Sequence, residues 1–176
     1  MWCANSGITV ASVAKATCQQ ATTLTAWHIA LPCGQCCRMA YRIASERTAH
    51  LKNVTWQMSG DWYQIVTVGN YKALLVHGDE INSFGGNTPA FGILRKVNAW
   101  STGVVEDFLD CYMGHFHTPM TLTMANSGRI FVTGSPESHN EYARAFIAAI
   151  GQPSQRLHFV DPVKGRVAAE YVVWLD

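Results

Sequence analysis

Three histidines follow apolar runs in the sequence, a setting in which imidazole groups commonly bind a metal ion. His115 and His117 are two residues apart and come just after the apolar run 108–113. In an extended backbone, side chains at positions i and i+2 point the same way, so we expect both imidazoles to face one spot. His77 ends another apolar run and is followed by Gly78. Because neutral imidazole binds zinc, manganese and iron, these three side chains are candidate metal ligands.

The order and spacing of these motifs resemble the C-terminal half of a calcineurin-like metallophosphoesterase. The match is with the small versions found in phage and bacterial genomes. His-Gly at 77–78 comes first, Gly-His-Phe-His at 114–117 comes second, and Thr-Gly-Ser at 133–135 follows a predicted hairpin. The resemblance extends over residues 38–176, which is most of the chain.

The resemblance implies both a cofactor and a reaction. It implies that His77 and His115 bind one divalent metal ion and that His117 binds a second. In such enzymes the ions polarise a phosphate mono- or diester, and a metal-bound hydroxide attacks phosphorus. Manganese or zinc is the expected metal, and three histidines without a bridging carboxylate suit a single zinc ion better. A nucleic acid would interact with the chain only as such a substrate.

The upstream ligand motifs of that family are missing here. The blocks Asp-x-His, Gly-Asp-x-x-Asp and Asn-His-Asp or Asn-His-Glu do not occur, and residues 1–45 contain neither Asp nor Glu. The bridging carboxylate and the histidine that assists the leaving group are therefore not visible. One interpretation is a phosphoesterase that takes its missing ligands from a partner chain or from acids such as Asp79. The alternative is a catalytically incomplete fragment that acts as a metal-binding or interaction module.

The acids that follow His77 have two possible roles. Asp79 and Glu80 are candidates for orienting the imidazole of His77, although solvated loop acids are the commoner role of such residues. The other four histidines have no ligand-like partners in the sequence, and we assign them to structural or surface positions: His28, His50, His139 and His158.

The resemblance implies an α/β fold, and the pattern of apolar residues agrees with it. The resemblance implies two sheets packed face to face as a β-sandwich, with helices outside and with the first half of the fold missing or replaced. Residues 62–68 and 71–77 alternate and are rich in β-formers, so they predict a hairpin around Gly69-Asn70. Further strands are expected at 110–113, 120–124, 129–132, 156–160 and 167–174, and helices at 36–50, 89–100 and 138–150.

Residues 1–35 differ in composition from the rest, and we treat them as an atypical N-terminal segment before a metallophosphoesterase-like domain at 36–176. Lys15 is the only charged residue of this segment. A Cys-x-x-C pattern at 33–36 has no second pair at zinc-finger spacing, so we interpret it as incidental thiols. The segment is a candidate replacement for the missing first half.

Length and composition limit the classes of protein further. The chain has 176 residues with 48% hydrophobic and 14% charged residues, which is typical of one globular domain. A net charge of +1 gives no electrostatic case for a dedicated nucleic-acid-binding protein. No apolar run approaches the roughly 18 residues that span a bilayer, and no convincing signal peptide begins the chain. We therefore expect a cytoplasmic protein with reduced cysteines, no membrane partner, and an open sheet edge that favours a homodimer.

Overall fold

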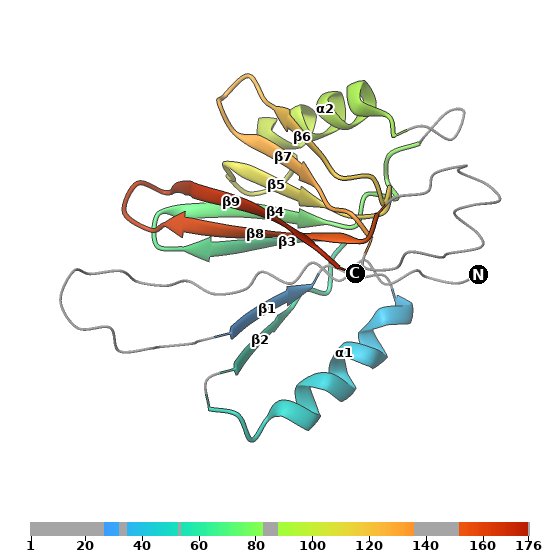
Figure 1. Ribbon diagram of the computed structural model, residues 1–176, viewed down its shortest axis with the longest axis vertical. Coiled ribbons are helices and arrows are strands. Elements are labelled where there is room, and N and C mark those ends of the chain that lie inside the picture. The colour runs from blue at the N-terminus through green and yellow to red at the C-terminus, as the bar shows by residue number, and fades with distance from the viewer. Residues whose placement is uncertain (1–26, 32–34, 53, 83–87, 136–151, 176) are drawn as a thin grey trace.

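The computed structural model describes residues 27–31, 35–52, 54–82, 88–135 and 152–175. Its centre is a five-stranded sheet with the strand order β3-β4-β5-β7-β6 (Figure 1). The strands of this sheet are β3 (Tyr63–Val68), β4 (Tyr71–Val76), β5 (Asp110–Met113), β6 (Met120–Thr123) and β7 (Arg129–Val132). Every one of these strands was predicted from the sequence, to within three residues at each end.

The three central strands run parallel, and this direction positions the candidate ligands. β4 pairs with β5 and β5 pairs with β7 in parallel, whereas β3 and β6 are antiparallel strands at the two edges. All four residues of β5 are buried, as parallel strands covered on both faces require. The carboxyl ends of β4 and β5 therefore lie at the same edge of the sheet, and His77 directly follows β4 there.

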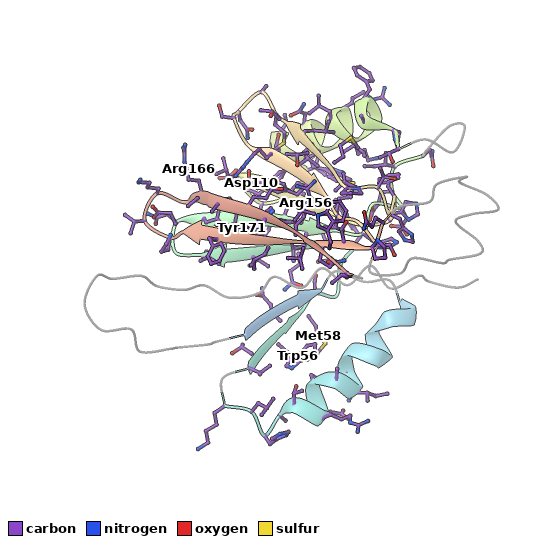
Figure 2. All side chains as sticks on the ribbon, viewed as in Figure 1. Trp56, Met58, Asp110, Arg156, Arg166 and Tyr171 are labelled. Carbon is purple, nitrogen blue, oxygen red and sulfur yellow. The ribbon has the colours of Figure 1, made fainter. Side chains whose placement is uncertain are left out.

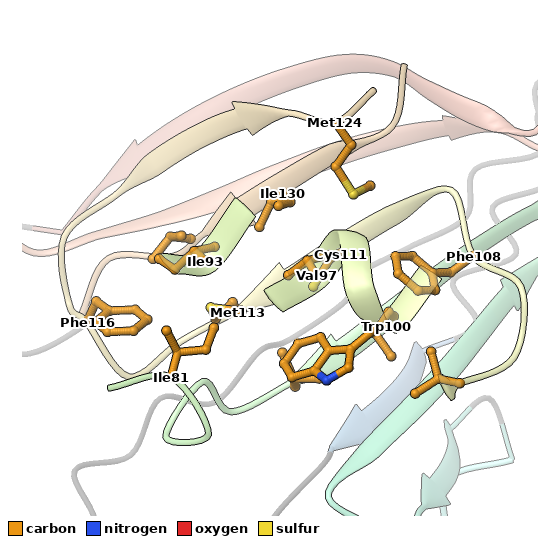
Figure 3. Packing of buried hydrophobic residues seen from close by; sticks show 14 residues of the cluster. Ile81, Ile93, Val97, Trp100, Phe108, Cys111, Met113, Phe116, Met124 and Ile130 are labelled. Atoms are coloured by element: carbon orange, nitrogen blue, oxygen red, sulfur yellow. The ribbon is translucent and has the colours of Figure 1, made fainter. Parts of the chain in front are cut away.

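Helix α2 (Ala90–Ala99) covers one face of the sheet. Ile93 and Val97 are fully buried in a cluster that also contains Leu74, Cys111 and Ile130 from the sheet (Figure 3). Pro89 stands immediately before the helix, where its missing N–H removes no helical hydrogen bond. A wide helical turn, Trp100–Val104, follows, and Gly103 inside it has a φ of 102°. The helix predicted at 89–100 is thus confirmed.

A hairpin of β8 (Ser154–Asp161) and β9 (Arg166–Trp174) covers the opposite face. Val167 of β9 packs in a second cluster with Tyr71, Leu75 and Phe131 of the main sheet. The two sheets therefore lie face to face, with α2 outside the larger one (Figure 1). The α/β fold with two packed sheets, predicted above, is confirmed.

The remaining described elements form a β-α-β unit near the N-terminal end. Strand β1 (Trp27–Leu31) pairs in parallel with β2 (Val54–Met58), and α1 (Gln35–Thr48) connects them. The indole N–H of Trp56 donates a hydrogen bond to the hydroxyl of Thr48 at 2.8 Å, which fastens the helix to β2. Strand β1 lies before the domain boundary proposed at residue 35, and β2 lies after it. The division of the chain into a segment 1–35 and a domain 36–176 stays a prediction.

Some expectations fall on residues outside the described ranges. The helix predicted at 138–150, the histidine at 139 and most of the N-terminal segment 1–35 belong to this group. Among the residues that the structure does describe, no helix combines the length and the apolar character needed to cross a membrane.

Candidate metal centre

The structure brings His77 and His115 together at the carboxyl edge of the sheet. Val76 and Met113 are partners in the register of β4 and β5, so the two loops leave the sheet side by side. The N–H of Gly114 donates a hydrogen bond to the carbonyl of His77 at 3.0 Å, which continues the pairing past the strand ends. Nε2 of His77 and Nδ1 of His115 are consequently only 3.3 Å apart.

Gly78 makes this approach of the two loops possible. Its φ is 110°, a conformation that other residues rarely adopt. A Cβ atom at this position would lie 2.8 Å from Cγ of Met113 and 3.2 Å from Cβ of His115. Any larger residue would therefore push the loop of His77 away from that of His115.

Glu80 stabilises the same turn through the backbone. Its carboxylate accepts a hydrogen bond from the N–H of Gly78 at 3.2 Å, and burial raises the pKa of this carboxyl. Asp79 is exposed to solvent. Glu80 therefore orients the peptide that follows His77, and its charge also interacts with the imidazole of His77. The predicted role of Asp79 and Glu80 in orienting that imidazole stays a prediction.

The expectation of an extended backbone at His115 and His117 is wrong. β5 ends at Met113, and φ is 63° at His115 and 56° at His117. The N–H of Phe116 donates to the carbonyl of Gly114 at 2.7 Å, so His115 is the central residue of a tight three-residue turn. Such backbone strain costs on the order of 1–3 kcal/mol and is concentrated at functional sites.

Burial of Phe116 explains the turn. Its ring belongs to the apolar cluster that also contains Ile81 and Met113 (Figure 3). With this aromatic ring directed into the core, His115 is exposed and His117 is half-buried. The two imidazoles thus leave a compact turn instead of projecting in parallel from a strand.

The separation of the two imidazoles fits a shared metal ion. Two nitrogens that bind one zinc ion at about 2.0–2.1 Å in tetrahedral geometry are about 3.3–3.4 Å apart. The 3.3 Å between Nε2 of His77 and Nδ1 of His115 matches this distance, and without a metal ion the same contact is a hydrogen bond between the two imidazoles. Although the residue is exposed as a whole, partial desolvation of its ring, and then the neighbouring His77, lower the pKa of His115 and favour the neutral form that binds metals.

The described residues do not assemble a complete ligand set. Among them, no group of three or more His, Cys, Asp or Glu side chains is arranged to hold a metal ion. His117 is near enough to contribute to the lowered pKa of His115. The assignment of all three histidines, His77, His115 and His117, as metal ligands stays a prediction.

Sequence reasoning missed a second polar cluster, which lies between the two sheets. The carboxylate of Asp110 is buried and accepts hydrogen bonds from the hydroxyl of Tyr71 at 3.0 Å and the backbone N–H of Arg129 at 2.7 Å. The hydroxyl of Tyr112 lies 2.6 Å from Nδ1 of His158. Burial raises the pKa of both tyrosines, so neither hydroxyl ionises in the folded protein.

This cluster continues onto the hairpin. Arg156 of β8, which Figure 2 labels, pairs with the carboxylate of Glu170 of β9. Burial and the charges of Arg156 and Arg129 lower the pKa of His158 to about 4. The sequence feature that could have predicted this cluster is the alternation of Arg156 and His158 with apolar residues in one predicted strand. We assigned His158 to a structural or surface position, and its place here is buried.

Comparison with solved structures finds partial similarities at low sequence identity. Vps29 complexed with zinc, from Entamoeba histolytica, has a TM-score of 0.46 and 17% identity, with 85% of this chain and 82% of that chain covered. Vps29 from Chaetomium thermophilum has a TM-score of 0.41 and 14% identity, with 69% and 68% covered. A conserved uncharacterised protein and predicted phosphoesterase from Streptococcus pneumoniae has a TM-score of 0.37 and 12% identity, with 70% and 71% covered. No family model and no curated protein matches the sequence.

Proposed function

We propose that this protein is a metallophosphoesterase-like protein that binds a divalent metal ion, zinc or manganese, through His77 and His115. Phosphate mono- or diesters are its proposed substrates. The observation that supports the site is the 3.3 Å separation of the two imidazole nitrogens. They stand where parallel strands of an α/β sheet end, which is the usual place for a ligand in such folds. The reaction class comes from the resemblance of the sequence motifs.

The residues around the pair are suited to hold it in place. A neutral imidazole offers one nitrogen lone pair to a metal ion, and the lowered pKa of His115 favours that form. The turn at Gly78, with Glu80 bonded to its N–H, holds the loop of His77 against that of His115. His117 is assigned to the second ion. Bound at this site, a divalent ion would supply positive charge that polarises a phosphoryl oxygen and the attacking water.

A second candidate function is a metal-binding or interaction module without turnover. The donor set favours it, because two imidazoles come together but, among the described residues, no third His, Cys, Asp or Glu side chain completes a group that could hold a metal ion. In this version the ligands for catalysis come from another chain, and the isolated protein binds one ion with modest affinity. Both candidates require the same pair of histidines, and they differ in hydrolysis.

Calorimetric titration with zinc and manganese tests the shared requirement. Wild-type protein should bind at pH 7.5 and bind more weakly at pH 5.5, because a protonated imidazole donates no lone pair. The variants His77→Ala and His115→Ala should each weaken binding at least tenfold. The matched control is His50→Ala, since His50 is an exposed histidine just past α1 and should leave binding unchanged. Equal affinity at both pH values, or in His115→Ala, would contradict the proposed site.

A further inference from the structure

Strand β9 has an edge without the protection that exposed strand edges usually carry. Within the described residues, β9 pairs with β8 alone. Residues 169–174 contain no Lys, Arg or Pro, and four consecutive apolar side chains are exposed there. Their exposed fractions are 58% for Tyr171, 44% for Val172, 40% for Val173 and 55% for Trp174. Soluble proteins normally blunt such edges with charges, prolines or bulges, so this edge fits a strand from a partner.

The backbone of this segment has its hydrogen-bonding groups available in a regular row. The N–H of Leu175 donates to the carbonyl of Pro153 at 2.9 Å, so residue 175 faces β8. In an antiparallel ladder, successive residues alternate between facing the neighbouring strand and facing away. The N–H and C=O groups of Glu170, Val172 and Trp174 therefore point to the free edge of β9. The irregular register lies at the other end of the strand, opposite Phe159 and Val160.

We propose that this edge is the interface of a homodimer, in which β9 pairs antiparallel with β9 of a second copy about a two-fold axis at Val172. This register places Val172 opposite its own symmetry mate and Glu170 opposite Trp174 of the second copy. The outward-pointing groups of these residues would form about six hydrogen bonds between the chains. The two hairpins become one four-stranded sheet with the order β8-β9-β9-β8.

The side chains of β9 are compatible with such a self-complementary contact. A two-fold interface uses the same patch on both copies, so a like charge must not meet itself. Glu170 is the one charged residue in 169–174, and its carboxylate already pairs with Arg156 of its own chain. Tyr171 would face Val173 of the second copy, an aromatic and β-branched pair of the kind that stabilises sheets. No charged side chain is placed opposite a like one.

The apolar surface continues from β9 onto β8, which enlarges the area available for the contact. Phe159 is 40% exposed, and its ring lies 5.8 Å from that of Tyr171 in an edge-to-face arrangement. Leu157 lies opposite Tyr171 in the register of the hairpin. This surface belongs to β8 and β9 alone, so the inference is independent of the proposed metal site.

Analytical ultracentrifugation of the full chain tests the interface. At tens of micromolar the wild-type mass should be twice the 19.4 kDa of the chain. Val172→Lys keeps the backbone N–H but places two ammonium groups opposite each other at the two-fold axis. The dissociation constant of the dimer should therefore rise at least tenfold at low salt. Val172→Thr is the matched control, because threonine keeps the N–H, the branched shape and the strand preference, and it should stay dimeric.

A charge-swap experiment tests the position of the two-fold axis. Val172→Glu should weaken the dimer by a similar factor, whereas a one-to-one mixture of Val172→Lys and Val172→Glu should form a tighter heterodimer because opposite charges then face each other. Slow hydrogen exchange at the amides of residues 170, 172 and 174 in the dimer should disappear in either variant alone. A monomeric wild type at 100 µM, or a Val172→Lys dimer as tight as the wild type, would overturn the proposal.

Discussion

The hydroxyl of Tyr112 and Nδ1 of His158 are 2.6 Å apart, and this contact links β5 of the large sheet to β8 of the hairpin. The hydroxyl of Tyr71 lies 3.0 Å from the carboxylate of Asp110 and 3.2 Å from the hydroxyl of Tyr112, so the contact extends to a buried carboxylate. On the other side of the imidazole, Nε2 of His158 lies 3.6 Å from the carboxylate of Glu170. The two sheets are thus joined by a polar contact inside their apolar interface.

Replacing Tyr112 by Phe should lower the free energy of unfolding by about 1–3 kcal/mol. The ring and its packing on Phe131 are kept, but Nδ1 of His158 and the hydroxyl of Tyr71 each lose the hydroxyl of Tyr112 as a hydrogen-bond partner. Urea denaturation at pH 7.5 measures the change. Tyr63→Phe is the control, because the hydroxyl of Tyr63 has no hydrogen-bond partner among the described residues, and this variant should change stability by less than about 0.5 kcal/mol. Equal effects of the two variants would mean that the Tyr112–His158 contact contributes nothing.

His158 should make the protein less stable as the pH falls below neutrality. Its pKa in the folded state is about 4, below the ordinary 6.5, because of burial and the nearby Arg156 and Arg129. Between pH 6.5 and about 4 the unfolded chain binds a proton that the folded protein excludes, so stability is full above this window and decreases through it. The loss should be on the order of 2 kcal/mol.

His158→Gln isolates this contribution. The glutamine side chain carries both a donor and an acceptor for the hydroxyl of Tyr112 and does not titrate, while every other histidine is unchanged. The difference in unfolding free energy between pH 7.5 and pH 4.5 should therefore be smaller in the variant by about 2 kcal/mol. An identical pH dependence in both proteins would show that His158 is protonated in the folded state as readily as in the unfolded chain.

Local sequence patterns predicted the elements of the sheet well. The hairpin around Gly69-Asn70 follows from alternation and from a turn residue that accepts positive φ, and Gly69 has a φ of 59°. Apolar runs followed by histidine also located the ends of β4 and β5, which is enough to place His77 and His115 at one edge once the strands are parallel neighbours. These features depend on residues close together in the chain.

The rest depends on packing between distant segments. The turn at His115 exists because Phe116 enters the core beside Ile81, and an i, i+2 pattern carries no information about that burial. The contact between Tyr112 and His158 joins residues 46 positions apart in sequence, and it appears only when the hairpin covers the sheet. Neither relationship is encoded in the spacing of nearby residues.

Gly78→Ala should disturb the proposed metal site more than any other change outside the histidines. The new Cβ would lie 2.8 Å from Cγ of Met113 and 3.2 Å from Cβ of His115, so the loop of His77 must shift. We expect at least tenfold weaker zinc binding, measured by calorimetry, together with a loss of about 1–3 kcal/mol in unfolding free energy.

Gly103→Ala separates the two effects of that substitution. Gly103 has a φ of 102°, close to that of Gly78, but a Cβ there would meet nothing within 4 Å. This variant should therefore carry the backbone strain without the displacement of a histidine. Zinc affinity should stay at the wild-type value. If Gly103→Ala weakened zinc binding as much as Gly78→Ala does, the effect would be due to general destabilisation of the fold.

The isolated chain should hydrolyse bis-p-nitrophenyl phosphate weakly or not at all in the presence of manganese. In-line attack on phosphorus usually needs a second ion that holds the phosphoryl oxygens. The described residues show no bridging carboxylate beside His77 and His115. Each tenfold loss of rate corresponds to about 1.4 kcal/mol of lost transition-state stabilisation, and several such steps are expected here.

A complementing chain and one histidine variant decide between the two proposed functions. A chain that carries the absent Asp-x-His and Gly-Asp-x-x-Asp motifs should raise the rate if the two chains assemble, because it would supply the carboxylates that a manganese pair prefers. His115→Ala should abolish that gain, and His50→Ala should preserve it. Fast turnover by this chain alone, lost in His115→Ala, would establish a complete enzyme and refute the module without turnover. Turnover that survives His115→Ala would refute both functions, because the reaction would then proceed without the imidazole pair that each of them requires.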